Sequence, residues 1–156
     1  MPSNLRHAEE TLRESLGPAA MPLVSFAHTV EEAVREADLA IDCVPDELES
    51  KLEIFSLLDR MAPPRTVFAT PTTNLSIADL ASCTYRPGQC IAIALDAAQL
   101  SRDPNPDDPN PDEPAQIPIR ITSQTTPKAK SLAAEFWERL GYSPVFELDA
   151  AESMLR

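Results

Sequence analysis

The stretch ADLAIDCVPDELESKLEIFSLLDRMAPPRTVFATPTTNLSIADLAS, residues 37–82, changes its hydrophobic spacing from one segment to the next. LAIDCV at 39–44 is a nearly continuous apolar run, which is typical of a strand covered on both faces, and Asp42 is the unusual residue in it. The segment 45–64 has helical spacing instead and ends at two prolines. TVFAT at 66–70 reads as a strand, and 74–84 as a short helix with Asn74 at its N-cap. Strand, helix, strand and helix in succession predict an α/β fold.

The segments before this stretch continue the alternation. Apolar residues at helical spacing predict a helix over 4–16, and Gly17-Pro18 ends it. LVSFAH at 23–28 is a short strand candidate. A helix is expected over 29–38, because Thr29 and Glu32 have the spacing of a capping box.

The segments after this stretch supply further strands. QCIAIAL at 89–95, IPIRITS at 117–123 and SPVFELD at 143–149 are strand-like. Between the last two, 126–141 predicts a helix with Thr126 at the N-cap and Gly141 beyond the end. We expect one Rossmann-like domain over 1–156, with a mainly parallel sheet, helices on both faces and a Pro/Asp-rich linker at 101–116.

Charge and hydropathy exclude several classes of partner. The net charge is -12, and the 13 basic residues are scattered among 25 acidic ones, so no basic surface for nucleic acid or anionic membranes is expected. No apolar run approaches the roughly 20 residues that span a bilayer, and the start of the chain lacks the apolar core of a signal peptide. The sequence predicts a cytoplasmic protein.

Metal sites are not expected. Cys43, Cys83 and Cys90 lack metal-ligand spacing and lie in or beside apolar segments, which favours buried free thiols. The acidic run DPNPDDPNPDEP at 103–114 has carboxylates for calcium, but its prolines stiffen the backbone and no glycine allows a coordination loop to turn. An extended, solvated linker is the expected state of this run.

The stretch 37–94 resembles the NAD-binding domain of the 3-hydroxyacyl-CoA dehydrogenases. The resemblance rests on VPDELESK followed by FATPTTNLSI, and it continues more faintly over 117–149. It implies that Asp46 lies beside the nicotinamide site, that Lys51 meets the cofactor or acyl-CoA, and that Thr73 takes the place of an active-site serine. Each residue also has a purely structural interpretation, as a helix-end acid, a solvated helix charge and a turn residue.

This sequence departs from the family's pattern in two places, the cofactor-binding turn and the catalytic residues. The family opens with a strand and a G-x-G-x-x-G turn that holds the pyrophosphate, whereas this sequence has three glycines and no such turn. It starts, by the resemblance, in the helix after the family's second strand, and the C-terminal helical domain is not matched. The family's catalytic histidine and the glutamate that orients it correspond to Ala94 and Ile119.

These departures lead to an expected function and its alternatives. We expect a non-catalytic relative that serves as a binding or assembly module and binds no cofactor with high affinity, with NAD as the ligand if there is one. One alternative is an NAD-dependent oxidoreductase component of fatty acid metabolism, completed by a partner chain that brings the Gly-rich segment. Another is a chain with no retained function. The unpaired edge of 39–44 predicts a homodimer, a partner chain or a fold-back of 23–28.

Overall fold

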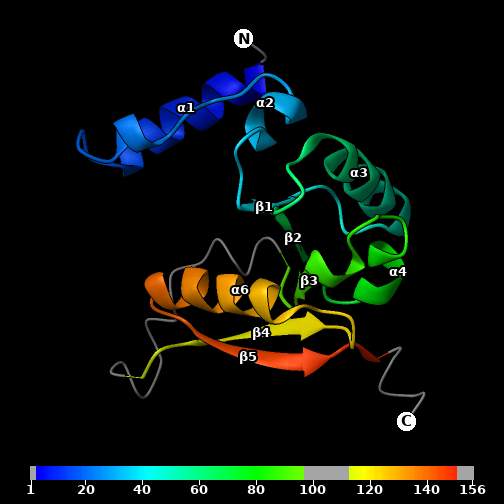
Figure 1. The fold of residues 1–156 in the computed structure, drawn as a ribbon. Coiled ribbons are helices and arrows are strands. Elements are labelled where there is room, and N and C mark those ends of the chain that lie inside the picture. Colours follow the sequence, from blue (N-terminus) through cyan, green and yellow to red (C-terminus); the bar gives the residue numbers. More distant parts are fainter. Residues whose placement is uncertain (1–2, 97–112, 151–156) are drawn as a thin grey trace.

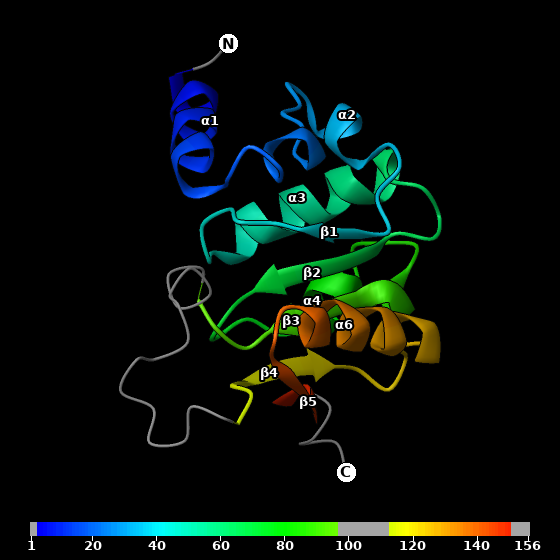
Figure 2. The ribbon, with the colours of Figure 1, turned by 90° about the vertical axis from the view of Figure 1, so that its left-hand side faces the viewer.

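The computed structural model describes residues 3–96 and 113–150 of the chain. Its centre is a five-stranded sheet in the order β1-β2-β3-β4-β5 (Figure 1). The strands are β1 (Leu39–Ile41), β2 (Val67–Pro71), β3 (Cys90–Ile93), β4 (Gln116–Ile121) and β5 (Ser143–Leu148). In Figure 2 the strands follow one another from β1 at one edge to β5 at the other.

Helices cover both faces of this sheet. They are α1 (Ser3–Ser15), α2 (Val30–Val34), α3 (Leu48–Met61), α4 (Ile77–Ala81) and α6 (Pro127–Arg139), with short 3-10 turns at Met21–Leu23 and Pro87–Gln89. Helices α3 and α4 lie on one face and α6 on the other (Figure 1). Helix α1 lies at the β1 end of the molecule and has no buried residue. None of the helices in the described ranges is long and apolar enough to span a membrane.

The alternation of strand side chains divides the core into two layers. On β2, Phe68 belongs to the layer beneath α3 and α4, while Val67 and Ala69 belong to the layer beneath α6. Phe68 meets Phe55 of α3 edge to face, with 5.9 Å between ring centroids. Burying one such ring stabilises the fold by about 1.5–3 kcal/mol, so these layers supply most of the driving force.

Strands β4 and β5 run opposite to β1, β2 and β3. The pairs β1–β2, β2–β3 and β4–β5 are parallel, whereas β3 pairs with β4 antiparallel, with Ala92 opposite Arg120 and Ile93 opposite Ile119. The prediction of a mainly parallel sheet with helices on both faces is therefore confirmed. Residue Gln116, placed in the linker by the sequence, begins β4; residues 97–112, with most of the predicted linker and of the acidic run, lie outside the described residues.

The strand predicted at 23–28 is wrong. Leu23 ends a 3-10 turn, and residues 24–28 pair with no described strand. The apolar residues of this segment, Val24 and Phe26, instead line a hollow shared with Leu16 beyond the end of α1. These contacts take up the apolar side chains of the segment without pairing its backbone with β1. The strand predicted at 39–44 is also shorter, since β1 ends at Ile41.

Two of the three predicted N-caps are confirmed. The Thr29 hydroxyl accepts from the N–H of Glu32 at 3.2 Å, and the Thr126 hydroxyl accepts from the N–H of Ala129 at 3.2 Å. Gly141 follows α6 with φ +86°, a conformation that suits glycine. Asn74 is not a cap.

Ser76 is the N-cap of α4, because the carboxylate of Asp149 fixes the start of that helix. Ser76 accepts from the N–H of Asp79 at 3.3 Å, and its own hydroxyl donates to Asp149 Oδ2 at 2.6 Å. The same Oδ2 also accepts from the N–H of Ala78 at 2.9 Å. This contact ties the end of β5 to α4, 71 residues away in the chain, and no local sequence pattern could reveal it.

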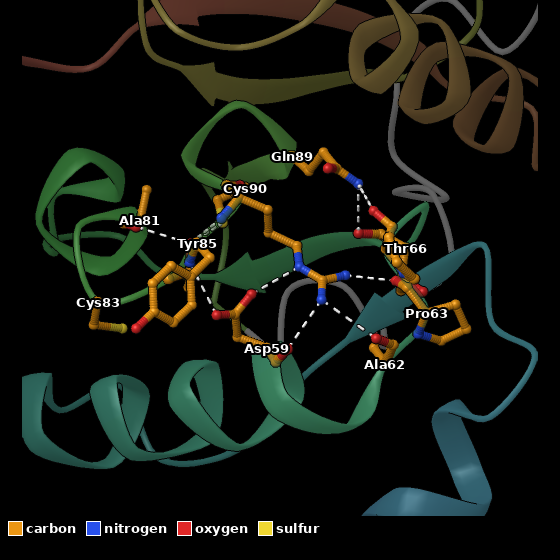
Figure 3. A network of polar contacts seen from close by, with 12 residues as sticks. Asp59, Ala62, Pro63, Thr66, Ala81, Cys83, Tyr85, Gln89 and Cys90 are labelled. Carbon is orange, nitrogen blue, oxygen red and sulfur yellow. Dashed lines mark hydrogen bonds and ion pairs between the residues drawn. The ribbon is translucent and has the colours of Figure 1, made fainter.

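A guanidinium group closes the C-terminal end of α3. Arg86 Nε donates to Asp59 Oδ1 at 2.8 Å, and its other nitrogens donate to the carbonyls of Asp59, Ala62 and Pro63. Figure 3 shows Asp59, Ala62 and Pro63 around this group, with Tyr85 and Gln89 nearby. The guanidinium also lies over the Phe68 ring, 4.8 Å from its centroid. The side chains of Arg86 and Asp59 are only 11% and 5% exposed.

Replacing Arg86 should therefore destabilise the fold strongly. We expect Arg86→Ala to lower the free energy of unfolding by about 3–5 kcal/mol, because a buried carboxylate and helix-end carbonyls lose their donor. Urea denaturation monitored by circular dichroism measures the change. Arg139→Ala is the matched control, since its pair with Glu135 is exposed and worth about 0.5 kcal/mol. Equal effects of the two substitutions would contradict this account.

Candidate functional site

Polar residues gather where the parallel strands β1 and β2 end. Asp42 and Asp46 follow β1, and Thr72 and Thr73 follow β2. The carboxyl ends of neighbouring parallel strands lie at the same edge of a sheet, where open α/β sheets bind ligands. The N–H of Thr73 donates to Asp46 Oδ2 at 3.2 Å. The structure thus brings together two of the three residues that the sequence indicates for cofactor binding.

The third residue, Lys51, points inward. Its ammonium donates to Asp42 Oδ1 at 2.7 Å, and the two side chains are 1% and 2% exposed. Asp42 Oδ1 also accepts from the N–H of Val44 at 3.3 Å. Lys51 is therefore not a solvated helix charge, and as placed it offers no donor to a ligand at the surface. Asp42 is explained by this pairing.

Three buried oxygens beside this pair have no hydrogen-bond partner among the described residues. They are Asp42 Oδ2, Asp46 Oδ1 and the Thr70 hydroxyl. Because Ile41 pairs with Ala69, Asp42 and Thr70 are neighbours on the same face of the sheet. Buried polar groups are nearly always hydrogen-bonded, so this corner of the fold has unused capacity for a hydroxyl, an amide or a water molecule.

Arg120 supports the turn that carries Thr73. It lies on β4, and its guanidinium donates to the carbonyls of Thr72, Thr73 and Leu75 at 3.1–3.4 Å. A charged residue at an alternate position of IPIRI is a normal strand pattern, so its role was not visible in the sequence. Arg120 thus holds the turn from β4, which lies beyond β3 in the sheet. Asp46 contacts the same turn from the segment that follows β1.

The positions that the resemblance assigns to the family's histidine and glutamate lie beside each other. The N–H of Ala94 donates to the Pro118 carbonyl at 2.9 Å, which places Ala94 one step along the ladder from Ile119. Ile119 is fully buried in the layer beneath α6. The backbone therefore keeps the two positions together, while neither side chain carries an ionisable group.

The described glycines do not form a cradle for a pyrophosphate. A Cβ on Gly17 or Gly141 would meet no atom within 4 Å, and a Cβ on Gly88 would lie 2.7 Å from the Gln124 carbonyl oxygen. Gly88 is thus required by packing against the turn that precedes α6. Dinucleotide binding in this architecture depends on close backbone approach to phosphate. The resemblance assigns Asp46 and Thr73 to the nicotinamide end of NAD, and the described glycines offer no cradle for its phosphates.

The described residues contain no cluster of three metal-ligating side chains. All three cysteines are free, but only Cys90 is buried as expected; Cys43 is exposed because the strand ends before it, and Cys83 is half-buried. Burial raises the pKa of the Cys90 thiol to about 12, so this thiol is an unreactive core residue.

The sheet order, the helices on both faces and the polar cluster at the strand ends define a Rossmann-like α/β domain. The structure is similar to that of (S)-3-hydroxybutyryl-CoA dehydrogenase from Ralstonia eutropha, with a TM-score of 0.70 at 16% identity over 93% of this chain and 49% of that one. A diketoreductase structure matches with a TM-score of 0.66 at 23% identity, over 92% and 49% of the two chains. At these identities the likeness concerns the fold.

The sequence supplies the family. Residues 4–94 match the family model described as 3-hydroxyacyl-CoA dehydrogenase, NAD binding domain, and the chain belongs to this family. A probable 3-hydroxybutyryl-CoA dehydrogenase of Bacillus subtilis (strain 168) is 37% identical over 70 residues, which are 45% of this chain and 24% of that protein. An L-carnitine dehydrogenase of Burkholderia mallei is 32% identical over 91 residues, or 57% and 28%. The chain spans about a quarter of the length of these curated relatives.

Removing the Lys51 ammonium should be costly. We expect Lys51→Met to lower the free energy of unfolding by about 3–5 kcal/mol, because Asp42 is left charged and buried without a partner. The double variant Asp42→Asn/Lys51→Met should recover most of this loss, since it removes both charges. Urea denaturation of the two variants measures the difference. A loss in Lys51→Met below about 1 kcal/mol would show that the ion pair is solvated.

Proposed function

We propose that this chain is a non-catalytic member of the 3-hydroxyacyl-CoA dehydrogenase family that acts as a binding or assembly module. The observation that carries the proposal is that Ala94 and Ile119, which the resemblance assigns to the family's histidine and glutamate, lie beside each other where β3 meets β4. Oxidation of an alcohol by NAD needs a group that takes the hydroxyl proton as the hydride leaves. The methyl group of Ala94 and the buried sec-butyl group of Ile119 cannot take it.

The cofactor part of the proposal is that NAD binds weakly or not at all. The Asp46–Thr73 contact offers polar atoms at the strand ends, but Lys51 is committed to Asp42 and the described glycines form no phosphate cradle. Most of the affinity of a dinucleotide in this architecture comes from backbone contacts to its phosphates. A cofactor held only at its nicotinamide end is released readily.

The assembly part of the proposal concerns the free edge of β1. Strand β1 pairs with β2 on one side, and no described strand lies on its other side. Proteins normally cover such an edge, because its unpaired N–H and C=O groups attract other strands. We propose that a second copy or a different polypeptide covers β1; the predicted fold-back of 23–28 is not an alternative, since that segment forms no strand.

The same edge supports a second candidate function. A partner that brings a Gly-rich strand and turn to β1 would place a phosphate cradle next to Asp46 and Thr73, and the assembly would be an oxidoreductase component. Whole relatives are named as dehydrogenases of 3-hydroxybutyryl-CoA and L-carnitine. This candidate requires the partner to supply the proton acceptor as well, because Ala94 lies within this chain.

Dehydrogenase activity of the chain alone should be negligible. We expect fewer than about 0.1 turnovers per second with acetoacetyl-CoA and NADH, because general acid/base catalysis is worth about 100-fold or more and typical enzymes turn over about 10 times per second. Loss of NADH absorbance measures the rate. The double variant Ala94→His/Ile119→Glu separates a missing proton acceptor, which it would restore, from a missing cofactor site, which it would not. Turnover of the unmodified chain at about one per second would defeat the proposal.

NAD affinity can be measured directly. Isothermal titration calorimetry of the chain with NAD and with NADH should give dissociation constants weaker than about 1 mM, for want of phosphate contacts. Asp46→Ala is the matched variant: it should weaken this binding further, because Asp46 is one of the two residues assigned to the nicotinamide end. A micromolar dissociation constant that Asp46→Ala abolishes would contradict the proposal and assign the cofactor to the strand ends.

A further inference from the structure

The free edge of β1 opens into an apolar groove. The groove has a volume of about 330 Å³ and lies between α2, β1 and α3; we call it the β1 groove. Its lining residues are Val30, Ala33, Val34, Ala37, Leu39, Ala40, Ile41, Asp42, Ile54 and Leu58. Nine of these ten are apolar, and the rim is accessible, because Ala33 is exposed and Ile41 is 37% exposed. Such a cavity lacks the packing that a finished core has.

The backbone of β1 presents hydrogen-bonding groups to this groove at strand spacing. The Asp38 carbonyl accepts from Val67 at 2.9 Å, and the Asp42 N–H donates to the Ala69 carbonyl at 3.2 Å, so both face β2. Strand residues alternate the side to which they turn their N–H and C=O. The N–H and C=O groups of Leu39 and Ile41 therefore point away from β2, toward the free edge. Two donors and two acceptors spaced in this way fit another extended backbone.

One polar side chain gives the groove a chemical preference. Asp42 lines it, and Asp42 Oδ2 is buried without a hydrogen-bond partner among the described residues. Lys51 already balances the charge of Asp42 through Oδ1, so Oδ2 needs a neutral donor rather than a second cation. A residue of an added strand beside Asp42 would lie about 5 Å away on the same face. Serine or threonine at that place can donate its hydroxyl to Oδ2.

A second copy of this chain fits the groove poorly. Antiparallel self-pairing that uses all the free groups sets Leu39 opposite Ile41 of the other copy. That register also sets Asp38 opposite Asp42 of the other copy, and like charges directly opposite each other are destabilising. The segment 29–42 carries five acidic residues and one basic residue, so two such surfaces repel. Ala40 would meet Ala40, which leaves the apolar lining unfilled.

We propose that the β1 groove binds an extended segment of a different polypeptide. That segment adds a strand to β1, fills the groove with apolar side chains at alternate positions, places a serine or threonine beside Asp42, and carries lysine or arginine at its ends to match the acidic surface. The inference rests on the proposed function as a binding module and names the chemistry of the partner. It makes Leu39, Ile41 and Asp42 recognition residues.

A designed peptide tests this directly. The probe is acetyl-Lys-Val-Thr-Val-Thr-Thr-Lys-amide, whose two valines and sixth-position threonine share one face of the strand, and it is titrated into the full chain labelled with nitrogen-15. We expect saturable binding with a dissociation constant below about 1 mM, with the largest shifts at the Leu39 and Ile41 amides. The matched control peptide has N-methyl groups on the amides that face β1, and it should bind at least tenfold more weakly. Equal binding of the two peptides, or no binding of the first, overturns the proposal.

Protein variants locate the binding site. Ala33→Phe narrows the groove from an exposed position and should weaken the probe at least tenfold, whereas Ser131→Phe, on the exposed side of α6, should not. Replacing the sixth-position threonine of the probe by valine should weaken binding to the natural chain but not to Asp42→Leu/Lys51→Met, which lacks the acceptor and the ammonium that pairs with it; equal loss in both proteins overturns the assigned role of Asp42. Sedimentation should show a monomer. A dimer that Ala33→Phe disperses would assign the groove to a second copy and overturn the proposal.

The outcomes remain separate from those of the activity measurements. If the chain reduces acetoacetyl-CoA while the peptide binds as expected, the proposed non-catalytic role fails and the groove stands. If activity is absent and the peptide does not bind, the groove fails and the non-catalytic role stands.

Discussion

Strand β2 pairs on both sides, and each of its five residues is buried. This double pairing is the constraint on which the rest of the structure depends. It sets the register of β1, and through that register it places Asp42 beside Thr70. It carries Phe68 to α3 on one face and Val67 and Ala69 to the α6 layer on the other. The turn after β2 contacts both Asp46 and Arg120. The position of β2, a strand without a charged residue, therefore sets the positions of the polar residues in the site.

The chain has a Rossmann-like sheet, and several polar side chains around it stabilise the fold. Lys51 balances Asp42 inside the core, Arg120 holds the turn of Thr73, and Asp149 starts α4. Each of these groups is tied to the backbone or to another charge, so it costs free energy to release for a ligand. Among the described residues, the hydrogen-bonding capacity left over lies with Asp42 Oδ2, Asp46 Oδ1, the Thr70 hydroxyl and the edge of β1. The proposed binding of another polypeptide at β1 would use this remaining capacity.

The sequence predicts the elements that signal themselves locally, and it fails where a distant group decides. Thr29 and Thr126 cap their helices as expected, because an N-cap bonds to residues of its own first turn. Ser76 rather than Asn74 caps α4, because the Asp149 carboxylate, at the end of β5, accepts a hydrogen bond from the Ser76 hydroxyl. The pattern at 23–28 forms no strand although the edge of β1 is free, because Val24 and Phe26 line a hollow beside Leu16 instead. In the site, Asp46 and Thr73 meet as the ends of neighbouring strands predict. The burial of Lys51 could not be predicted, because it depends on the Asp42 carboxylate that faces it in the fold.

The antiparallel step from β3 to β4 has a consequence for chain entropy. Adjacent antiparallel strands can be joined by a turn of two residues, yet here residues 94–115 connect them. The free energy of closing a flexible connection grows only with the logarithm of its length, so doubling it costs about 0.6 kcal/mol. The hydrogen bonds and side-chain contacts between β3 and β4 stabilise this part of the sheet, and the length of the connecting segment contributes little. The register of β3 and β4 therefore depends on the residues that pair, such as Ala92 with Arg120, and only weakly on how many residues separate the two strands in the chain.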